Sequence, residues 1–135
     1  MAETFKLFKG GIETKDKKAA EAFKNRMQFK SYDQCQYLNE FAMVLGEDTV
    51  LLDFDDAEQA EIMLRIIKSE QLKCRVVKTN KGLHVFFKNE ERRIDSACSK
   101  STWMLAIGLA ADIKVGHKNS YAVSKINGKL REIIY

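Results

Sequence analysis

The stretch Val50-Leu51-Leu52-Asp53-Phe54-Asp55-Asp56 decides the fold that we expect for this chain. Three apolar residues lead into two carboxylates two positions apart, and a helical pattern follows at once. Side chains alternate between the faces of a strand, so Asp53 and Asp55 should project from the same face. Two carboxylates on one face repel each other unless a cation or a proton lies between them. The stretch therefore indicates a divalent metal site at the end of a strand or, more plainly, a strand running into an acidic helix cap at Asp56.

The composition is that of one ordinary globular domain, with 135 residues, 45% hydrophobic and 31% charged. The longest apolar run, residues 103–111, is interrupted by Gly108 and is too short to span a bilayer, so we expect no membrane association. The cysteines, Cys35, Cys74 and Cys98, are scattered and include no Cys-x-x-Cys pair. This pattern argues against a zinc ribbon or a disulfide framework, and it favours a reduced, cytoplasmic setting.

An acidic central segment is flanked by basic sequence. Residues 47–70 hold two Lys/Arg against eight Asp/Glu, whereas residues 5–30 hold eight against three and residues 73–135 hold thirteen against five. This charge distribution is consistent with a polyanionic partner that the basic segments bind around a metal held by the acidic segment. Solvated faces explain the charge by itself at least as well.

The apolar pattern predicts an N-terminal helical part, residues 1–47, and a core, residues 48–135. We expect one helix over residues 16–26. A second is expected over residues 31–45, because Ser31 and Gln34 form a capping box, apolar residues follow at helical spacing, and Gly46 supplies a stop.

In the core, a doubly buried strand (48–54), a helix capped by Asp56 (to residue 70) and a strand (73–78) read as a βαβ unit. Further strands are expected over residues 83–88, 111–115, 121–126 and 130–135. Asn127-Gly128 is a two-residue hairpin signal, Arg92 and Arg93 lie in a polar loop, and residues 100–110 fit either a short helix or irregular backbone. The chain ends inside an apolar strand, which favours a domain excised from a longer protein.

Three segments carry candidate site residues, namely Asp53-Phe54-Asp55, then Gly82-Leu83-His84, then Ala111-Asp112. Each has a plain structural alternative. A lone histidine in an apolar strand is often a core residue whose hydrogen bonds are satisfied. Asp112 could form an ion pair with Lys114 or cap a turn. Gly82 could be needed only for the backbone conformation of a turn. The set in this order, with carboxylates and a histidine all borne on strands, indicates a shared site.

That order resembles the archaeo-eukaryotic primase superfamily, in particular the primase-polymerase (prim-pol) domains of phage and plasmid replication proteins. Its first motif is an apolar run ending in Asp-x-Asp, which Asp53-Phe54-Asp55 matches. Its second is a small residue, any residue, then His on a strand, which Gly82-Leu83-His84 matches with Gly where many members have Ser. Its third is an apolar residue and a carboxylate, here Ala111-Asp112. The resemblance covers about residues 48–135, including Lys114 and the stretch from residue 116 to 122.

The resemblance implies a role for each matched residue. Asp53, Asp55 and Asp112 would hold two divalent metals, Mg²⁺ or Mn²⁺, which clamp the attacking and leaving oxygens in phosphoryl transfer. His84 would contact the phosphates of the incoming nucleotide. Lys81, Lys114 and Lys118 are candidates for contacts with the nucleotide phosphates or the template backbone, on charge and position alone.

The function implied is that of a DNA primase and DNA polymerase, a nucleotidyltransferase that makes primers from nucleoside triphosphates on a single-stranded DNA template. The full-length protein could also contain a helicase domain, which this sequence does not show. The fold implied is α/β (α+β) in two layers, one domain over residues 1–135. The βαβ unit would pack beside an antiparallel sheet like that of RNA-recognition domains, which would hold His84 and Asp112.

Two rival functions remain open. A metal-dependent nuclease would use the same carboxylates, although a histidine that contacts a triphosphate favours a polymerase. A catalytically idle module that binds single-stranded nucleic acid or nucleotides would bind without Mg²⁺ or Mn²⁺ and would leave labelled triphosphates unincorporated.

Two geometric expectations follow from the primase interpretation. The three carboxylates should lie together and should each have a raised pKa without metal, because ionising one disfavours ionising the next. His84 should share a strand face with Phe86 and project into a cleft, where the carboxylates would favour its protonated form. The opposite face, formed by Leu83, Val85 and Phe87, should pack in the core.

Overall fold

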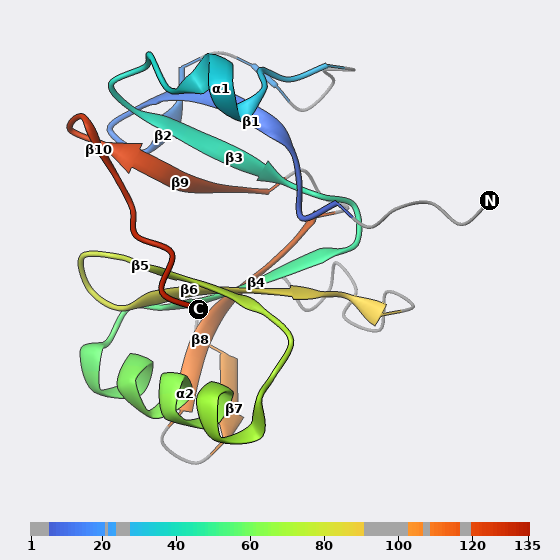
Figure 1. Ribbon diagram of the computed structural model, residues 1–135, viewed down its shortest axis with the longest axis vertical. Helices are drawn as coiled ribbons and strands as arrows, with labels where there is room; N and C mark the ends of the chain where they lie inside the picture. The colour runs from blue at the N-terminus through green and yellow to red at the C-terminus, as the bar shows by residue number, and fades with distance from the viewer. Residues whose placement is uncertain (1–5, 21, 24–27, 91–102, 107–108, 117–119) are drawn as a thin grey trace.

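The computed structural model describes residues 6–20, 22–23, 28–90, 103–106, 109–116 and 120–135. These residues form two five-stranded antiparallel sheets and two helices, an α+β fold. Sheet I has the strand order β10-β9-β3-β1-β2, and sheet II has the order β5-β6-β4-β8-β7. Sheet I lies above sheet II in Figure 1, and the long helix α2 lies below sheet II.

The strands of sheet I are β1 (Phe8–Lys15), β2 (Lys18–Ala19), β3 (Phe41–Leu45), β9 (Tyr121–Ile126) and β10 (Lys129–Leu130). The strands of sheet II are β4 (Thr49–Phe54), β5 (Arg75–Lys78), β6 (Leu83–Lys88), β7 (Trp103–Ala106) and β8 (Leu109–Val115). The helices are α1 (Tyr32–Cys35) and α2 (Ala57–Glu70).

The prediction of a helix over residues 16–26 is wrong for the part of this range that the structure describes. Asp16 and Lys17 instead form the turn between β1 and β2, with φ of 52° and 68°. Short polar residues such as Asp adopt this left-handed conformation more readily than most, which suits a tight turn. The N-terminal part is therefore built mainly of strands.

The second expected helix begins as predicted but ends after four residues. The capping box is present, since the Gln34 N–H donates to Oγ of Ser31 and the Ser31 N–H donates to Oε1 of Gln34. Residues 41–45 form β3, which pairs with β1 on one side and β9 on the other and is buried throughout. A short uninterrupted apolar run fits a buried helix or a buried strand, and only the neighbouring strands decide between them. Gly46 accordingly follows a strand.

Sheet II confirms the elements expected around the acidic stretch. Asp56 caps α2 by accepting a hydrogen bond from the Gln59 N–H (3.0 Å), and Gln71 ends the helix in the left-handed conformation. Ala60, Met63 and Ile67 recur at helical spacing and are buried against the sheet.

The βαβ unit is present in a different arrangement from the one expected. β4 and β5 each pair antiparallel with β6, so they run parallel to each other with β6 between them. β8, which carries Asp112, pairs with the other edge of β4. The strands that carry His84 and Asp112 therefore belong to the same sheet as the βαβ unit, and the expectation of a separate sheet beside it is wrong.

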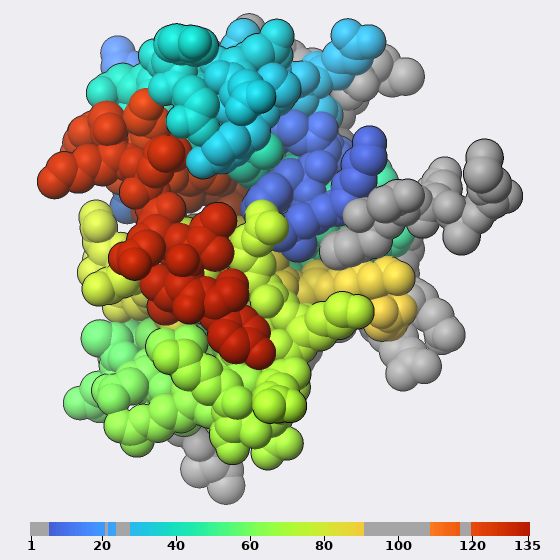
Figure 2. Space-filling view, viewed as in Figure 1, coloured from blue at the N-terminus to red at the C-terminus, as the bar shows by residue number. Residues whose placement is uncertain are grey.

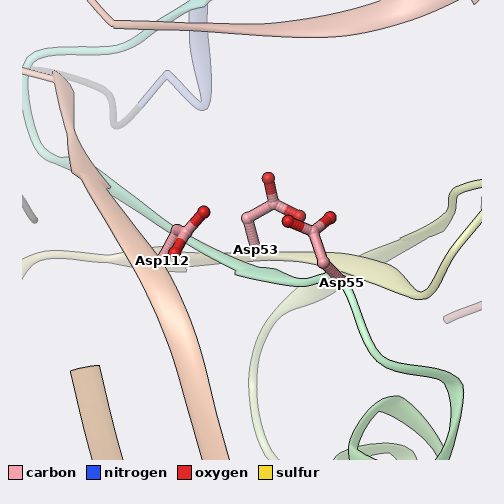
Figure 3. A group of neighbouring side chains, drawn as sticks. All are labelled: Asp53, Asp55 and Asp112. Carbon is pink, nitrogen blue, oxygen red and sulfur yellow. The ribbon is translucent and has the colours of Figure 1, made fainter. Parts of the chain in front are cut away.

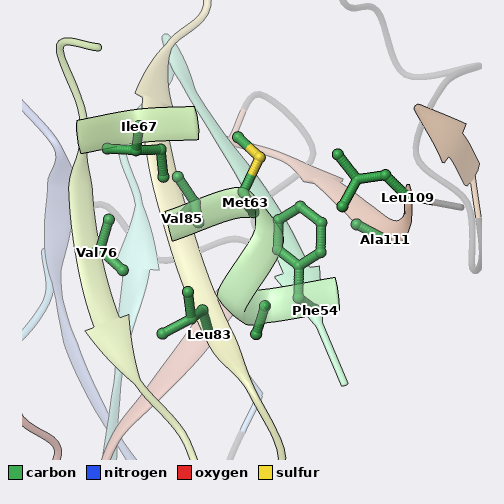
Figure 4. Packing of buried hydrophobic residues seen from close by; sticks show 9 residues of the cluster. Phe54, Met63, Ile67, Val76, Leu83, Val85, Leu109 and Ala111 are labelled. Carbon is green, nitrogen blue, oxygen red and sulfur yellow. The ribbon is translucent and has the colours of Figure 1, made fainter. Parts of the chain in front are cut away.

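Two apolar clusters hold sheet II in place. Below it, Phe54, Met63, Ile67, Val76, Leu83, Val85, Leu109 and Ala111 pack between the strands and α2 (Figure 4). Above it, Leu45, Leu51, Phe86 and Ala122 pack between the two sheets, with Phe8 edge-on to Phe86 at 5.2 Å between ring centroids. Sheet II thus has one face against the helix and part of the other against sheet I.

The C-terminal part crosses from one sheet to the other. Asn127 and Gly128 have φ of 51° and 75°, as the predicted hairpin turn requires. β10 is only Lys129–Leu130, so it contains Leu130 alone of the strand expected over residues 130–135. The C-terminal segment, residues 131–135, then runs along β5, where the Ile134 N–H donates to the Val76 carbonyl (2.9 Å). Figure 2 shows this segment in red, lying on the surface from the sheet I half onto the sheet II half.

The remaining expectations from the sequence have different outcomes. The strands expected over residues 111–115 and 121–126 are confirmed as β8 and β9. Within residues 100–110, β7 and the start of β8 are strands, so neither a helix nor irregular backbone describes the part that is placed. Arg92, Arg93, Cys98 and Lys118 lie outside the described residues. Neither described helix is long and apolar enough to cross a membrane.

Candidate metal centre

A single row of side chains crosses three strands of sheet II. Asp53 on β4 lies opposite His84 on β6 and, on its other side, opposite Asp112 on β8. Directly opposed residues in antiparallel strands have their side chains on the same face and close together. The strand register therefore brings the second and third motifs to the first without any contribution from loops.

The three carboxylates meet on this face. Each of Asp53, Asp55 and Asp112 offers a carboxylate oxygen, and these atoms all lie within 4.8 Å of one another. Figure 3 shows the three side chains on the same side of sheet II, with Asp55 turned toward Asp53. A cation between hard oxygen ligands at this spacing would relieve their mutual repulsion, so the triad could hold a metal ion. The expected convergence of the carboxylates is confirmed.

The two carboxylates of the first motif have opposite pKa shifts. Burial, the nearby charges of Asp53 and Asp112 and a hydrogen bond with Asp53 raise the pKa of Asp55, as expected for clustered carboxylates, although Lys81 acts the other way. Burial also acts to raise the pKa of Asp53, but His84 and Lys114 outweigh it and hold the pKa below its usual value. The expectation of a raised pKa is therefore wrong for Asp53, because it lies between two groups that stabilise its charge.

His84 projects from the face opposite Leu83 and Val85, as predicted. Leu83 and Val85 pack toward α2, whereas His84 lines a hollow between the two sheets and is 7% exposed. Its Nε2 lies 3.4 Å from Oδ1 of Asp53, close enough for an ion pair but not aligned as a hydrogen bond. Among the described residues, neither that oxygen nor Nδ1 of His84 has a hydrogen-bond partner, which is unusual for buried polar atoms.

The turn before His84 depends on glycine. The Thr79 N–H donates to the Gly82 carbonyl (3.0 Å), and the Gly82 N–H donates to Oγ1 of Thr79 (3.1 Å). A Cβ at Gly82 would collide with the carbonyl oxygen of Phe54, the residue between Asp53 and Asp55. Close approach of two strand ends thus accounts for glycine at this position.

A hollow of about 350 Å³ lies over the carboxylates, between the sheets. This site hollow is lined by Asp53, Asp55, His84, Thr79, Asn80, Tyr121, Ala122, Val123 and four cationic side chains, Lys17, Lys81, Lys114 and Arg131. Lys81 and Lys114 are therefore located where the sequence suggested. Lys17 and Arg131 come from sheet I and were not expected, because the sequence predicts a helix around residue 17 and an ordinary strand around residue 131.

A second hollow, of about 320 Å³, adjoins the first. This apolar hollow is lined by Phe8, Tyr32, Met43, Val77, Phe86 and Ile133, with Arg75 and Ser124 also contributing. His84, Val123 and Arg131 line both hollows and so form the boundary between them. No motif in the sequence marks the apolar hollow, since its residues come from both sheets, α1 and the C-terminal segment.

Comparison of the chain with protein-family models, curated proteins and solved structures found no match. The residues of the site and their geometry are therefore the basis for inferring its function.

Proposed function

We propose that this chain is the catalytic domain of a DNA primase-polymerase. It would join nucleoside triphosphates on a single-stranded DNA template with the help of Mg²⁺ or Mn²⁺ at Asp53, Asp55 and Asp112. The observation that carries the proposal is the meeting of these carboxylates beside His84 on one sheet face. The same residues, in the same order, bear the resemblance to the primase superfamily.

The donor set supports a hard divalent cation. Carboxylate oxygens are the preferred ligands of Mg²⁺ and Mn²⁺, and no cysteine among the described residues lines the site hollow. A divalent metal bound there would neutralise charge that develops on the transferring phosphoryl group. The low pKa of Asp53 keeps this carboxylate ionised and ready to act as a ligand.

The cations around the hollow support a triphosphate as substrate. Four cations, Lys17, Lys81, Lys114 and Arg131, line the hollow together with two carboxylates of the triad, Asp53 and Asp55, so the lining is net positive, and a bound divalent metal would add to this positive charge. Lys81 and Lys114 are the side chains from sheet II that would bind phosphate oxygens. His84, whose Nδ1 has no partner in the described part of the chain, would donate a hydrogen bond to one of them and so help to orient the triphosphate for in-line attack.

The test is a primer-synthesis assay on circular single-stranded DNA, with labelled ribo- or deoxynucleoside triphosphates and Mg²⁺ or Mn²⁺. We expect metal-dependent incorporation by the wild type and a loss of at least a hundredfold for Asp53→Asn and for Asp112→Asn, which is about 2.7 kcal/mol of transition-state stabilisation. Asp56→Asn is the matched control, because Asn caps a helix as well as Asp does and Asp56 is not part of the triad.

The same assay separates the rival functions. A nuclease would cut the circular DNA in the presence of metal and would incorporate no labelled nucleotide. An idle binding module would retain single-stranded DNA equally well with and without metal. Either result, obtained with folded wild-type protein, would reject the primase-polymerase proposal.

A further inference from the structure

Arg131 brings a guanidinium group from sheet I to the space over the metal centre. Its backbone N–H donates to the Ser124 carbonyl (2.8 Å), which continues the β9–β10 ladder by one residue. Its Nη1 donates to the Val123 carbonyl (3.0 Å). Two bonds to β9 therefore hold the residue, and its side chain lines both the site hollow and the apolar hollow.

One buried nitrogen of this guanidinium, Nε, has no hydrogen-bond partner among the described residues. No ion pair joins Arg131 to any carboxylate in the described part of the chain. Burial lowers the pKa of Arg131, and the charges of Asp53 and Glu40 oppose this only in part. A half-buried cation without a direct counter-ion is unfavourable, and such a group calls for a functional explanation.

An anion between Arg131 and the acidic triad would supply the missing partner. The forked donors of arginine match the oxygens of a phosphate group better than those of lysine do. Lys17, an exposed residue of the β1–β2 turn, lines the same hollow from the same sheet. The carboxylates opposite favour an anion that binds together with a metal, because the metal would neutralise their charge.

We propose that Arg131, assisted by Lys17, is an oligophosphate-binding residue of the site. It would hold a phosphate group from sheet I while a metal at Asp53, Asp55 and Asp112 holds the same oligophosphate from sheet II. The ligand class is the di- or triphosphate of a nucleotide, which rests on the proposed function. The phosphate contact itself requires neither a nucleobase nor a template.

The test measures binding of inorganic tripolyphosphate in the presence of Mn²⁺ by isothermal titration calorimetry. We expect Arg131→Gln to weaken binding by tenfold to a hundredfold, the effect of losing charge-assisted hydrogen bonds. Lys129→Gln is the matched control, because it removes an exposed cation two residues away on β10 and should leave the affinity unchanged. Without ligand, Arg131→Gln should melt at the wild-type temperature or above it, since it removes an uncompensated charge.

Arg131→Lys provides a second variant, which keeps the positive charge but loses the forked N–H donors of the guanidinium. It should bind tripolyphosphate several-fold more weakly than the wild type, and it carries the test if the Gln variant does not fold. If Arg131→Gln binds tripolyphosphate with wild-type affinity, the proposal is overturned. If only Arg131→Lys folds, wild-type affinity of that variant overturns it. So does a wild-type protein that binds no tripolyphosphate with Mn²⁺. Wild-type binding that Arg131→Gln weakens, without nucleotide incorporation on DNA, would keep this anion site and reject only the polymerase function.

Discussion

Asp53 and Asp55 are the same amino acid two positions apart, yet their surroundings shift their pKa values in opposite directions. Asp53 lies between His84 and Lys114, which lower its pKa against the effect of burial. Asp55 lies at the end of β4, where burial and the charges of Asp53 and Asp112 raise its pKa. The triad therefore contains one carboxylate that the fold stabilises in its charged form and one that it destabilises.

This difference predicts opposite effects of two similar substitutions on the metal-free protein at neutral pH. Asp53→Asn should lower the free energy of unfolding by on the order of 1 kcal/mol, because it removes a charge that His84 and Lys114 stabilise. Asp55→Asn should raise the melting temperature, because it removes the repelled charge. Both variants should lose the rise in melting temperature that Mn²⁺ gives the wild type. A higher melting temperature for Asp53→Asn would show that repulsion dominates at both positions.

The raised pKa of Asp55 also predicts a pH dependence. The folded protein binds the Asp55 proton more tightly than the unfolded chain does, so this group makes stability fall as pH rises above the ordinary value of 3.8. The stability advantage of Asp55→Asn should therefore grow with pH in this window and become constant above the folded-state pKa. Denaturant unfolding of both proteins between pH 4 and pH 7, without metal, measures this difference. An advantage that shrinks as pH rises would contradict the assigned shift.

His84 is the residue at which a binding role and a core role make different predictions. His84→Ala should weaken nucleoside triphosphate binding and primer synthesis while the protein stays folded. Because the ring is buried, we also expect a stability loss of about 1–3 kcal/mol. Thermal melting together with incorporation per folded molecule separates the two roles. Normal incorporation per folded molecule would leave His84 with a structural role alone.

At the scale of elements, the close approach of the β5–β6 turn to the end of β4 positions the first motif. Gly82→Ala would force a Cβ against the Phe54 carbonyl, so either the turn or the end of β4 must move. We expect a stability loss on the order of 2 kcal/mol and a smaller Mn²⁺-induced rise in melting temperature, because Asp55 follows Phe54 directly. Gly128→Ala is the control, since it strains a turn far along the sequence at a positive φ and should leave the Mn²⁺ effect intact.

At the scale of the whole molecule, the metal centre and the hollows lie between the two sheets. Segments that are far apart in the sequence hold these sheets together. The C-terminal segment leaves sheet I after β10 and pairs with β5 of sheet II, where the Val76 N–H donates to the Tyr135 carbonyl (3.1 Å). The hydroxyl of Tyr135 also donates to the Leu72 carbonyl (2.9 Å). This crossing carries Arg131 at its start and so couples the position of the guanidinium to both sheets.

Removal of residues 133–135 tests the contribution of this crossing. The truncated chain should lose on the order of 2 kcal/mol of unfolding free energy, because two backbone hydrogen bonds and the Tyr135 contact disappear. Amide hydrogen exchange should become faster at Val76, which loses its acceptor. Lys78 is the internal control, since its N–H donates to the retained Glu132 carbonyl (2.8 Å). Equal protection of Val76 in both proteins would show that the segment adds nothing to the edge of β5.

The amino-acid sequence by itself determined the elements whose signals are local. The cap at Asp56, the apolar stripe of α2, the hairpin turn at Asn127-Gly128 and the apolar run into Asp53 each depend on a few adjacent residues. Alternation along β4 and β6 also predicted which faces Asp53, Asp55 and His84 would present. The candidate triad could be selected from the sequence because strand-borne carboxylates are conspicuous among apolar neighbours.

The tertiary structure alone decided the rest, because the deciding interactions join residues far apart in the chain. Residues 41–45 are a strand because β1 and β9 pair with them, although their apolar run fits a helix equally well. The insertion of β6 between β4 and β5 made one sheet where two were expected. Lys17 and Arg131 reach the site only because sheet I packs over sheet II, and the pKa of Asp53 is lowered against the effect of burial by His84 and Lys114, which neighbouring strands supply.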